Sequence, residues 1–393
     1  MTTPMAMWEA SLRRRPSVLP LPVLEALSQH GAEVVVMGQV AGGACWHAMP
    51  GRERGTLVLA AERENDAMKA IVQDRYGSAD VLELREVQDP VAGEGDVLIR
   101  VHAAGCGPDV WHLMAGLPYF VRLMPGFYKM RAGVRGSDVS GVVEAVGAKV
   151  TGFRAGDEVM GEARGSFAEL AIARADQLVR KPARLSFEQA AAVPISGVTA
   201  LQALRDVATV GEGQRLLVIG AAGGVGTFAV QIGKALGTEV TGVCSTSKLE
   251  LVRSIGADEV IDYTREDFTD GTRRWDVIVD TAGRRPVGVL ARALAKGGTL
   301  AIVGGEGGGK WTGGFFRQIL RAPILSLFTG KRLRPVTSKV RHDDLQALAE
   351  MIEAGTVTPV VGKTYPLIEA PEALRHLAEG HSRGKVVINV TPP

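Results

Sequence analysis

The sequence predicts an α/β protein in which a barrel of short strands precedes a doubly wound parallel sheet. Residues 68–184 contain short apolar runs broken by glycines, which favours a small β-barrel. After residue 190, apolar strands alternate with helical segments, which is typical of parallel βαβ units. Residues 216–237 show this alternation most clearly, because a buried strand, a glycine-rich turn and an amphipathic helix follow one another.

The expected strands of the barrel are short and close together. They cover residues 68–73, 81–84, 96–102, 141–147, 156–160 and 165–171. Those of the parallel sheet cover residues 215–220, 239–244, 259–262, 275–280 and 298–304. A helix near 343–354 and a last strand, 385–390, form a tail that we expect to return to the barrel.

Residues 1–67 differ from the rest of the chain, because they are rich in Arg, Pro, Gly and Ala and show little sustained periodicity. We expect them to form an extension outside the fold. A targeting peptide is the alternative, since Arg13–Arg15 are accompanied by only one acid in the first 24 residues. Glu25 and Glu33 weaken that alternative. The expected boundaries are therefore 1–67 for the extension, 68–190, 191–330 and 331–393.

Composition narrows the functional classes. The 393 residues are 46% hydrophobic and 22% charged, with a formal net charge of +2, which is ordinary for an enzyme and gives no reason to expect nucleic acid as a partner. The uncharged run Leu216–Gly233 is long enough to span a membrane, but its glycines fit a strand-turn-helix better. Cys45, Cys106 and Cys244 are too few for a disulfide framework, so we expect a cytoplasmic protein without a membrane partner.

The glycine-rich turn predicts a dinucleotide site. In the G-x-G-x-x-G register its glycines are Gly223 and Gly226, and Ala221 takes the first position. Gly223 would let the backbone approach a pyrophosphate, and Gly226 would let the helix pack closely on the strand. Free amides at the helix N-terminus would face the negative charge.

The next strand indicates which dinucleotide binds. Sites for NAD place a carboxylate at the end of this strand, where it holds the ribose 2′-hydroxyl. Here Cys244 is followed by Ser245, Thr246 and Lys248, and no acid ends the strand. Hydroxyls and a lysine suit a 2′-phosphate, so we predict NADPH. The alternative is an ordinary solvated loop before the helix that begins near Leu249.

Several motifs in order now resemble a known family. The chain is similar to the medium-chain dehydrogenase/reductase superfamily, in its zinc-independent quinone oxidoreductase-like branch. The likeness spans residues 68–390 and rests on segments 68–72, 108–116, 136–147, 156–159, 190–200, 221–226, 256–263 and 384–387. It implies a GroES-like β-barrel catalytic domain, a Rossmann nucleotide-binding domain and a possible homodimer.

The resemblance also bears on metal binding. Zinc-dependent members take a histidine from a Gly-His-Glu segment, which here reads Gly136-Ser137-Asp138. Alignment on residues 111–116 places Gly107 at the first-ligand position, next to Cys106. We therefore predict no metal, and we expect Cys106 to be a small buried residue beside the nicotinamide. Gly107 also replaces the asparagine that members often carry in this loop.

The residue patterns and the resemblance together assign roles to individual residues, and the resemblance contributes Thr199, Ala222, Gly224, Val225, Tyr263, Val303 and Gly304. The predicted cofactor-binding residues are Thr199, Ala222, Gly223, Gly224, Val225, Gly226, Ser245, Thr246, Lys248, Tyr263, Val303 and Gly304. The predicted catalytic set is Tyr119, Cys106 and Gly107, with Tyr119 as the favoured proton donor. Tyrosines and phenylalanines within residues 117–128 suit a small hydrophobic acceptor, although a lid or an interface would have the same composition.

Without a Lewis acid, conjugate reduction is easier than alcohol oxidation. We therefore predict NADPH-dependent hydride transfer to a quinone or an α,β-unsaturated carbonyl. One alternative is an enoyl-thioester reductase of the same branch. Another is a non-catalytic NADPH-binding sensor or interaction protein.

Overall fold

The computed structural model describes residues 67–119, 122, 133–305, 313–380 and 382–391, and the backbone of three short strands nearer the N-terminus. In helix α9 (Gly313–Thr329) the side chains of residues 313–317 and 319 lie outside this description. The chain divides into two units, Met1–Ala67 and Met68–Pro393. In the first unit the three strands form a sheet of order β1-β3-β2, with β1 at Val34–Val36, β2 at Trp46–Pro50 and β3 at Leu57–Ala61.

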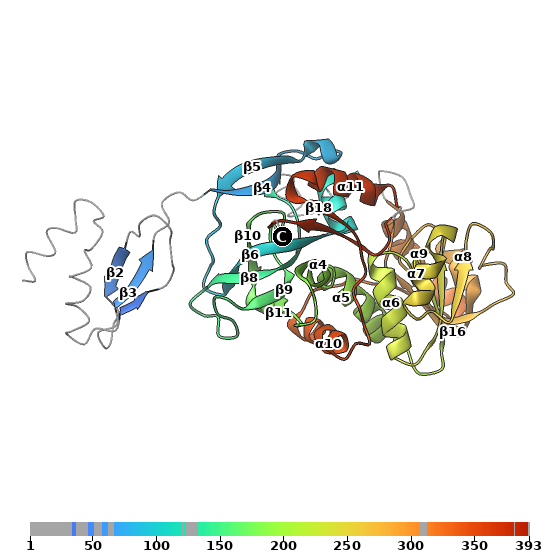
Figure 1. Cartoon of the computed structure of the whole chain (residues 1–393). Helices are drawn as coiled ribbons and strands as arrows, with labels where there is room; N and C mark the ends of the chain where they lie inside the picture. Colours follow the sequence, from blue (N-terminus) through green and yellow to red (C-terminus); the bar gives the residue numbers. More distant parts are fainter. Residues whose placement is uncertain are drawn as a thin grey trace, which may run out of the picture. The chain divides into compact units, whose positions relative to one another are not determined.

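The second unit begins with short strands packed around an apolar core (Figure 1). Its larger sheet has the order β11-β9-β8-β6-β19-β18, and β10 also pairs with β6. The sheet strands from this part of the chain are β6 (Asp96–Cys106), β8 (Asp138–Val146), β9 (Glu158–Glu162), β10 (Leu170–Arg174) and β11 (Leu178–Arg180). A smaller sheet of order β5-β4-β7 contains β4 (Ala67–Gln73), β5 (Glu83–Gln88) and β7 (Gly133–Val134). Helix α3 (Pro108–Ala115) follows β6 directly.

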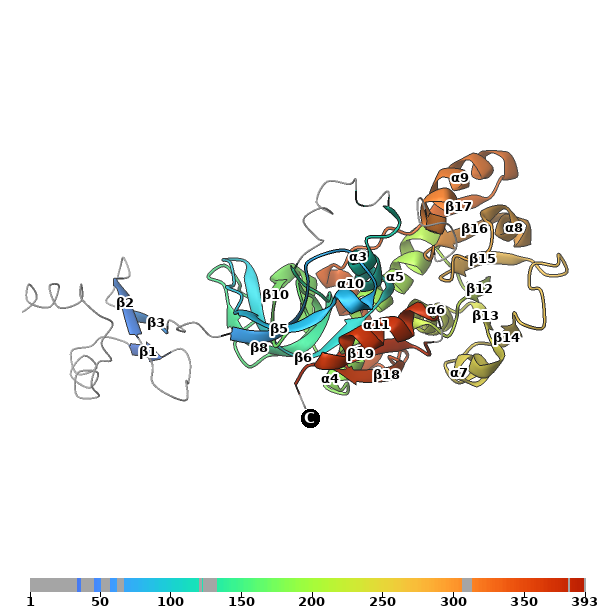
Figure 2. The ribbon, with the colours of Figure 1, turned by 90° about the horizontal axis from the view of Figure 1, so that it is seen from above.

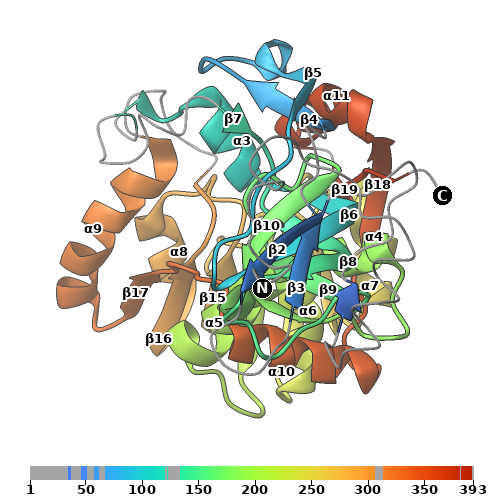
Figure 3. The ribbon, with the colours of Figure 1, turned by 90° about the vertical axis from the view of Figure 1, so that its left-hand side faces the viewer.

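The C-terminal tail returns to these strands. Strand β19 (Lys385–Asn389) runs antiparallel to β6 and places Val386 opposite Cys106, and β18 (Val361–Pro366) lies on its other side. Figure 3 shows this arrangement, with the red tail strands beside the cyan β6. Helices α10 (His342–Glu353) and α11 (Ala370–Ala378) belong to the same tail. The tail packs on the barrel because β19 buries the consecutive residues Val386, Val387 and Ile388 there.

Several predicted barrel strands had shifted boundaries, and two of them show the reason. The strand expected at 165–171 is observed at Leu170–Arg174, because Gly165 has a φ of +74° and belongs to a turn. The strand expected at 81–84 begins only at Glu83, since Val81 ends a short 3₁₀ turn, Ala79–Val81. Gly165 therefore marked a turn, whereas Gly141 and Gly161 lie inside β8 and β9.

The nucleotide-domain sheet is wholly parallel, in the order β14-β13-β12-β15-β16-β17 (Figure 2). Its strands are β12 (Arg215–Ile219), β13 (Glu239–Cys244), β14 (Glu259–Asp262), β15 (Trp275–Asp280), β16 (Leu294–Ile302) and β17 (Arg332–Pro335). Its order confirms the predicted doubly wound Rossmann architecture, because the chain reverses direction across the sheet after β14.

Helices cover both faces of this sheet. Alternate residues of β12 divide between two apolar clusters, with Leu216 and Val218 on one face and Leu217 and Ile219 on the other. The first face packs against α5 (Pro194–Gln202), α6 (Gly224–Ala235) and α7 (Leu249–Ser254), and the second against α8 (Val287–Ala293). Helix α4 (Phe187–Ala191) precedes α5, and a π-helical turn, Ala203–Ala208, follows it. Such two-sided burial requires continuous apolar strands.

Candidate functional site

The glycine-rich turn joins β12 to α6 with very little space between them. Gly220 has a φ of +80°, a conformation that glycine adopts without strain. A Cβ on Gly226 would lie 2.1 Å from the carbonyl oxygen of Gly220, so only glycine fits there. A Cβ on Gly223 would meet only that same oxygen, at 3.4 Å. Gly226 thus serves packing within the protein, whereas Gly223 borders open space.

The N-terminus of α6 can accept an anion. Its N-cap residue, Gly223, provides no side-chain hydrogen bond to the helix. Among the described residues, no acceptor takes a hydrogen bond from the backbone N–H groups of Gly224, Val225 or Gly226. Unpaired N–H groups at a helix N-terminus carry partial positive charge and suit a phosphate. This geometry fits the pyrophosphate of a dinucleotide.

The C-terminal tail holds the same turn from outside. The N–H of Gly384 donates to the carbonyl oxygen of Ala222 over 2.8 Å, and Gly384 forms a parallel bridge with Gly223. The glycine-rich turn is therefore held by a segment about 160 positions later in the chain.

The loop predicted to bind the 2′-phosphate, residues 245–248, lies beside positively charged Arg383 of the tail. The Lys248 ammonium donates to the carbonyl oxygen of Ser382 over 2.8 Å, and the Arg383 guanidinium donates to that of Ser247 over 2.8 Å. Burial lowers the pKa of Lys248, and the charges of Arg383 and Arg284 lower it further. These arginines are far from Lys248 in sequence, and sequence reasoning missed them because only the fold brings them together.

A carboxylate also lies beside this loop. Asp262, at the end of β14, stands in register with Cys244 and accepts a hydrogen bond from the Thr246 hydroxyl over 2.5 Å. It also accepts from the amide and hydroxyl of Thr264. These hydrogen bonds, with the Thr246 and Thr264 hydroxyls first, lower the pKa of Asp262 and keep it ionised. The sequence search looked for an acid only at the end of β13 and so overlooked this one on the neighbouring strand.

The other predicted adenosine-side residues are accessible. Ser245 is half-buried, and Tyr263 is 49% exposed. The N–H of Tyr263 donates to the carbonyl oxygen of Cys244 over 3.2 Å, which places the tyrosine at the carboxyl end of the sheet. Both residues thus flank the predicted 2′-phosphate loop, and their roles there stay predictions.

At the far end of the predicted cofactor site, Asp280 organises two loops. Its Oδ1 accepts from the N–H groups of Ala282 and Gly283, and its carbonyl oxygen accepts from those of Val303 and Gly304. Burial raises the pKa of Asp280 to about 6 against the effect of those amides. The backbone N–H groups of Val303 and Gly304 are therefore already hydrogen-bonded within the protein. Contact of these residues with the carboxamide of the nicotinamide would have to use their other atoms.

Thr199 is buried in helix α5, and its hydroxyl donates to the Ser338 hydroxyl over 2.9 Å. This bond joins α5 to the segment after β17. The predicted place of Thr199 beside the cofactor stays a prediction.

On the acceptor side, Cys106 and Gly107 lie at the end of β6. Cys106 is 1% exposed, and burial raises the pKa of its thiol to about 12, so the thiol stays protonated. A Cβ on Gly107 would lie 2.3 Å from Oδ1 of Asp109 and 3.0 Å from Nζ of Lys385. Those two side chains lie in the space that an asparagine at this position would enter.

A buried ion pair lies directly behind this turn. Nζ of Lys385 is 2.7 Å from Oδ2 of Asp138, and the side chains are 4% and 1% exposed. The ammonium also donates to the Ser196 hydroxyl over 3.2 Å. Burial alone would lower the pKa of Lys385, but the charges of Asp138 and Asp109 outweigh it and raise that pKa. The sequence contains no sign of this pair, because its members are 247 positions apart (385 minus 138).

Tyr119 contacts Arg122, apart from the ion pair of Lys385 and Asp138. The guanidinium carbon of Arg122 is 4.7 Å from the ring centroids of both Tyr119 and Tyr76. Arg122 also donates to the carbonyl oxygens of Ala115 and Gly116 at the end of α3. The apolar segment 117–128 is described only to Tyr119 and at residue 122, so most of the predicted acceptor surface lies outside the described residues.

Glu162 is a second acid near Asp138 that sequence reasoning missed. It stands opposite Asp138 in the β8–β9 register and accepts from the Gln177 amide over 2.8 Å. Burial, with the charges of Asp138 and Asp109, raises the pKa of Glu162 from 4.5 to about 7. The folded protein therefore binds this proton more tightly than the unfolded chain does.

This shift predicts a pH-dependent stability. The contribution of Glu162 is fully present below about pH 4.5 and is lost as the pH rises to about 7. We expect Glu162→Gln, which keeps an acceptor for Gln177, to raise the free energy of unfolding at pH 8 by about 1–3 kcal/mol. Urea denaturation between pH 4.5 and 8 measures it. An unchanged slope of stability with pH in the variant would contradict the prediction.

The donor set does not fit zinc. Among the described residues, no three His, Cys, Asp or Glu side chains gather closely enough to hold a metal ion. Ser137 stands where zinc-dependent proteins of this kind have a histidine, and Gly107 carries no ligand.

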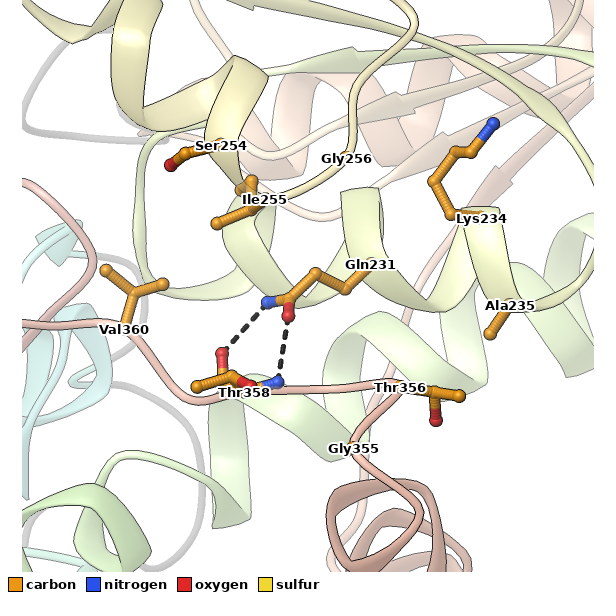
Figure 4. A pocket seen from close by; sticks show the side chains of 10 residues that line it. All are labelled: Gln231, Lys234, Ala235, Ser254, Ile255, Gly256, Gly355, Thr356, Thr358 and Val360. Atoms are coloured by element: carbon orange, nitrogen blue, oxygen red, sulfur yellow. Dashed lines mark hydrogen bonds between the residues drawn. The ribbon is translucent and has the colours of Figure 1, made fainter.

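A separate hollow of about 690 Å³ lies along the second half of α6 (Figure 4). The side chain of Gln231 bridges the amide and the carbonyl of Thr358 there, and Lys234 is paired with Asp258. Because its polar groups already have partners, this hollow is a junction between α6 and the tail rather than a second site.

None of the described helices is long and apolar enough to cross a membrane.

Comparisons with known proteins identify the family. Residues 93–183 match the family model of the alcohol dehydrogenase GroES-like domain, and residues 255–388 match that of the zinc-binding dehydrogenases. A mitochondrial NAD(P)H oxidoreductase of Mus musculus is 33% identical over 381 residues, covering 86% of this chain and 92% of its own. The 2-methylene-furan-3-one reductase of Solanum lycopersicum is 34% identical over 341 residues, covering 83% and 80%.

Solved structures agree. The quinone oxidoreductase of Coxiella burnetii superposes with a TM-score of 0.72 at 28% identity, covering 83% of this chain and all of its own, 100%. A mycobacterial protein complexed with NADPH has a TM-score of 0.71 at 27% identity, covering 82% and 100%. The fold, the glycine-rich turn and these relatives together show that the chain belongs to the medium-chain dehydrogenase/reductase family, in its quinone oxidoreductase-like branch.

Proposed function

We propose that the protein uses NADPH to reduce a quinone or an α,β-unsaturated carbonyl compound, without a metal ion. The observation that carries the proposal is the uncapped N-terminus of α6 beside the basic loop of Lys248 and Arg383. NADPH carries a pyrophosphate and a 2′-phosphate. The N-terminus of α6 suits the pyrophosphate, and the basic loop suits the 2′-phosphate.

The relatives support the acceptor class. The structure from Coxiella burnetii is a quinone oxidoreductase, and the tomato protein is a reductase of a 2-methylene-furan-3-one, which contains an enone. The mycobacterial neighbour was solved with NADPH. The first two names support a conjugated carbonyl acceptor, and the third supports NADPH as the cofactor.

The bound cofactor would supply the hydride. The chain itself would bind the phosphates through α6 and the Lys248 loop, and the loops organised by Asp280 would limit where the nicotinamide can lie. The acceptor oxygen gains negative charge on reduction and needs a proton. The proposed donor is the hydroxyl of Tyr119, because the buried Cys106 thiol, with a pKa of about 12, holds its proton too tightly.

Replacing Lys248 tests the choice of cofactor. We expect Lys248→Ala to raise the KM for NADPH about 10-fold, because a 2′-phosphate would lose a charged partner worth about 1.4 kcal/mol. The KM for NADH should change less than about twofold, since NADH lacks that phosphate. Steady-state kinetics with both cofactors measure the ratio. If both values change equally, Lys248 does not select the phosphate, and Asp262 becomes the candidate for holding a free ribose hydroxyl.

Lys296→Ala is the matched control for Lys248→Ala. It removes the same charge from an exposed residue near the amino end of β16, the opposite end of the sheet. Both KM values should stay unchanged.

The function is tested with purified protein, NADPH, and a panel of quinones, enones and enoyl thioesters, with and without a zinc chelator. We expect oxidation of NADPH with quinones or enones that the chelator does not affect. Activity restricted to enoyl thioesters would favour the enoyl-thioester reductase. Tight NADPH binding without turnover would favour a sensor or interaction protein, and zinc-dependent alcohol oxidation would overturn the proposal.

The remaining expectations stay predictions: a homodimer, a cytoplasmic location, and the separate role of residues 1–67. Size measurement in solution and localisation of the full chain address them directly.

A further inference from the structure

One short segment of the tail touches both halves of the proposed site. Its main chain holds the phosphate-binding turn, because the N–H of Gly384 donates to Ala222. Its side chain, that of Lys385, reaches the acceptor-side strands and pairs with Asp138. The N–H of Lys385 itself donates to the carbonyl oxygen of Val360, which anchors the segment to the tail.

The ammonium of Lys385 has neighbours from several parts of the chain, and the charge of Asp109 acts on it as well. It lies 2.7 Å from Oδ2 of Asp138 in β8 and 3.2 Å from the Ser196 hydroxyl in α5. A third neighbour is Gly107, whose Cβ would lie 3.0 Å from Nζ. Asp138 is fixed in turn, because its Oδ1 accepts from the N–H of Ile195 over 2.8 Å.

Two glycines border the pair at positions where a side chain would press on it. A Cβ on Gly105 would lie 2.6 Å from Oδ2 of Asp138, and a Cβ on Gly224 would lie 3.1 Å from the Ser196 hydroxyl and 3.5 Å from Cδ of Lys385. Gly224 is the first residue of α6, so the lysine stem lies against the start of the phosphate-binding helix. The ion pair thus lies between the acceptor-side strands and the start of α6.

We propose that Lys385 is a positioning residue that sets the distance between the phosphate-binding turn and the acceptor-side turn at Cys106–Gly107. The inference rests on the proposed function, since it concerns the alignment of a cofactor with an acceptor. An ion pair specifies one geometry, whereas apolar side chains of similar volume would allow several. A misplacement of about 1 Å between reacting groups can cost about 100-fold in rate.

The test removes both charges together, so that no unpaired charge stays buried. For Lys385→Met/Asp138→Asn we expect the dissociation constant of NADPH, measured by fluorescence, to change less than about threefold. The kcat with the best quinone or enone should fall about 10- to 100-fold. The single variant Lys385→Arg, which retains a cation for Asp138, should recover most of this kcat.

A matched control removes another ion pair between separate elements. Arg205 and Asp344 join the π-helical turn to α10, and their side chains lie 2.6 Å apart. Arg205→Met/Asp344→Asn should leave kcat unchanged. A wild-type kcat in the Lys385/Asp138 double variant, or a fall explained entirely by lost NADPH occupancy, would overturn the proposal.

A second measurement separates this proposal from the proposed function. If the wild-type protein reduces no acceptor in the panel, the proposed function fails, but amide hydrogen exchange of the NADPH-bound protein still tests the positioning. The double variant should exchange faster than wild type in peptides covering residues 384–389 and 136–140. Equal exchange rates would overturn the positioning role regardless of activity.

Discussion

Gly226→Ala is expected to destabilise the protein by about 1–3 kcal/mol and to abolish measurable NADPH binding. The new methyl group would lie 2.1 Å from the carbonyl oxygen of Gly220 and 2.8 Å from the Cα of Ala221. Both contacts are with backbone, so α6 must move away from β12. That movement withdraws the free N–H groups from the pyrophosphate. Thermal denaturation and NADPH fluorescence titration measure the two effects.

Gly223→Ala is the matched control on the same turn. Its methyl group meets no protein atom closer than 3.4 Å, so we expect an unchanged melting temperature. NADPH should nevertheless bind about tenfold more weakly, because the methyl group occupies space that the pyrophosphate needs. If Gly226→Ala bound NADPH normally, or if Gly223→Ala unfolded the protein, the assignment of the two glycines would be wrong.

Lys385→Met alone is expected to destabilise the protein by about 3–5 kcal/mol, because it leaves the Asp138 carboxylate buried without its cation. Asp138 is only 1% exposed and cannot regain water without opening the structure. Adding Asp138→Asn should restore most of that stability, since an uncharged pair costs little to bury. Urea denaturation of the two single variants and the double variant gives the coupling energy.

If the losses of unfolding free energy in the two single variants simply added up in the double variant, the prediction would be wrong, because the two charges would then not interact. The pair Lys149–Glu94 provides a control. Its side chains are 73% and 70% exposed, so removing either charge should change the free energy of unfolding by less than about 1 kcal/mol.

Much of the fold could be predicted from sequence, because its signals are local. A strand, a turn and a helix in that order indicate a βαβ unit, and residues 216–237 contain all three. Helix α6 ends at Ala235, and Gly237, with a φ of +77°, closes it as predicted. Strand boundaries in the barrel were less accurate, since glycines such as Gly165 mark turns and strands alike in a sequence.

The geometry of the glycine-rich turn was predictable for the same reason, and the contacts around Gly107 were not. Gly107 looked like a lost asparagine, and only the structure shows that Asp109 and Lys385 occupy the space. Asp262 and Glu162 gave no signal, because their importance comes from neighbours on adjacent strands.

By itself, the sequence determined the two architectures, the glycine-rich turn and the absence of zinc ligands at Gly107 and Ser137. These are properties of residues close together along the chain. The tertiary structure alone decided that Arg383 joins Lys248, and that Lys385 joins Asp138 behind the turn. Such pairings depend on how the tail crosses to β6, and charge pairing in a buried space has no local pattern in a sequence.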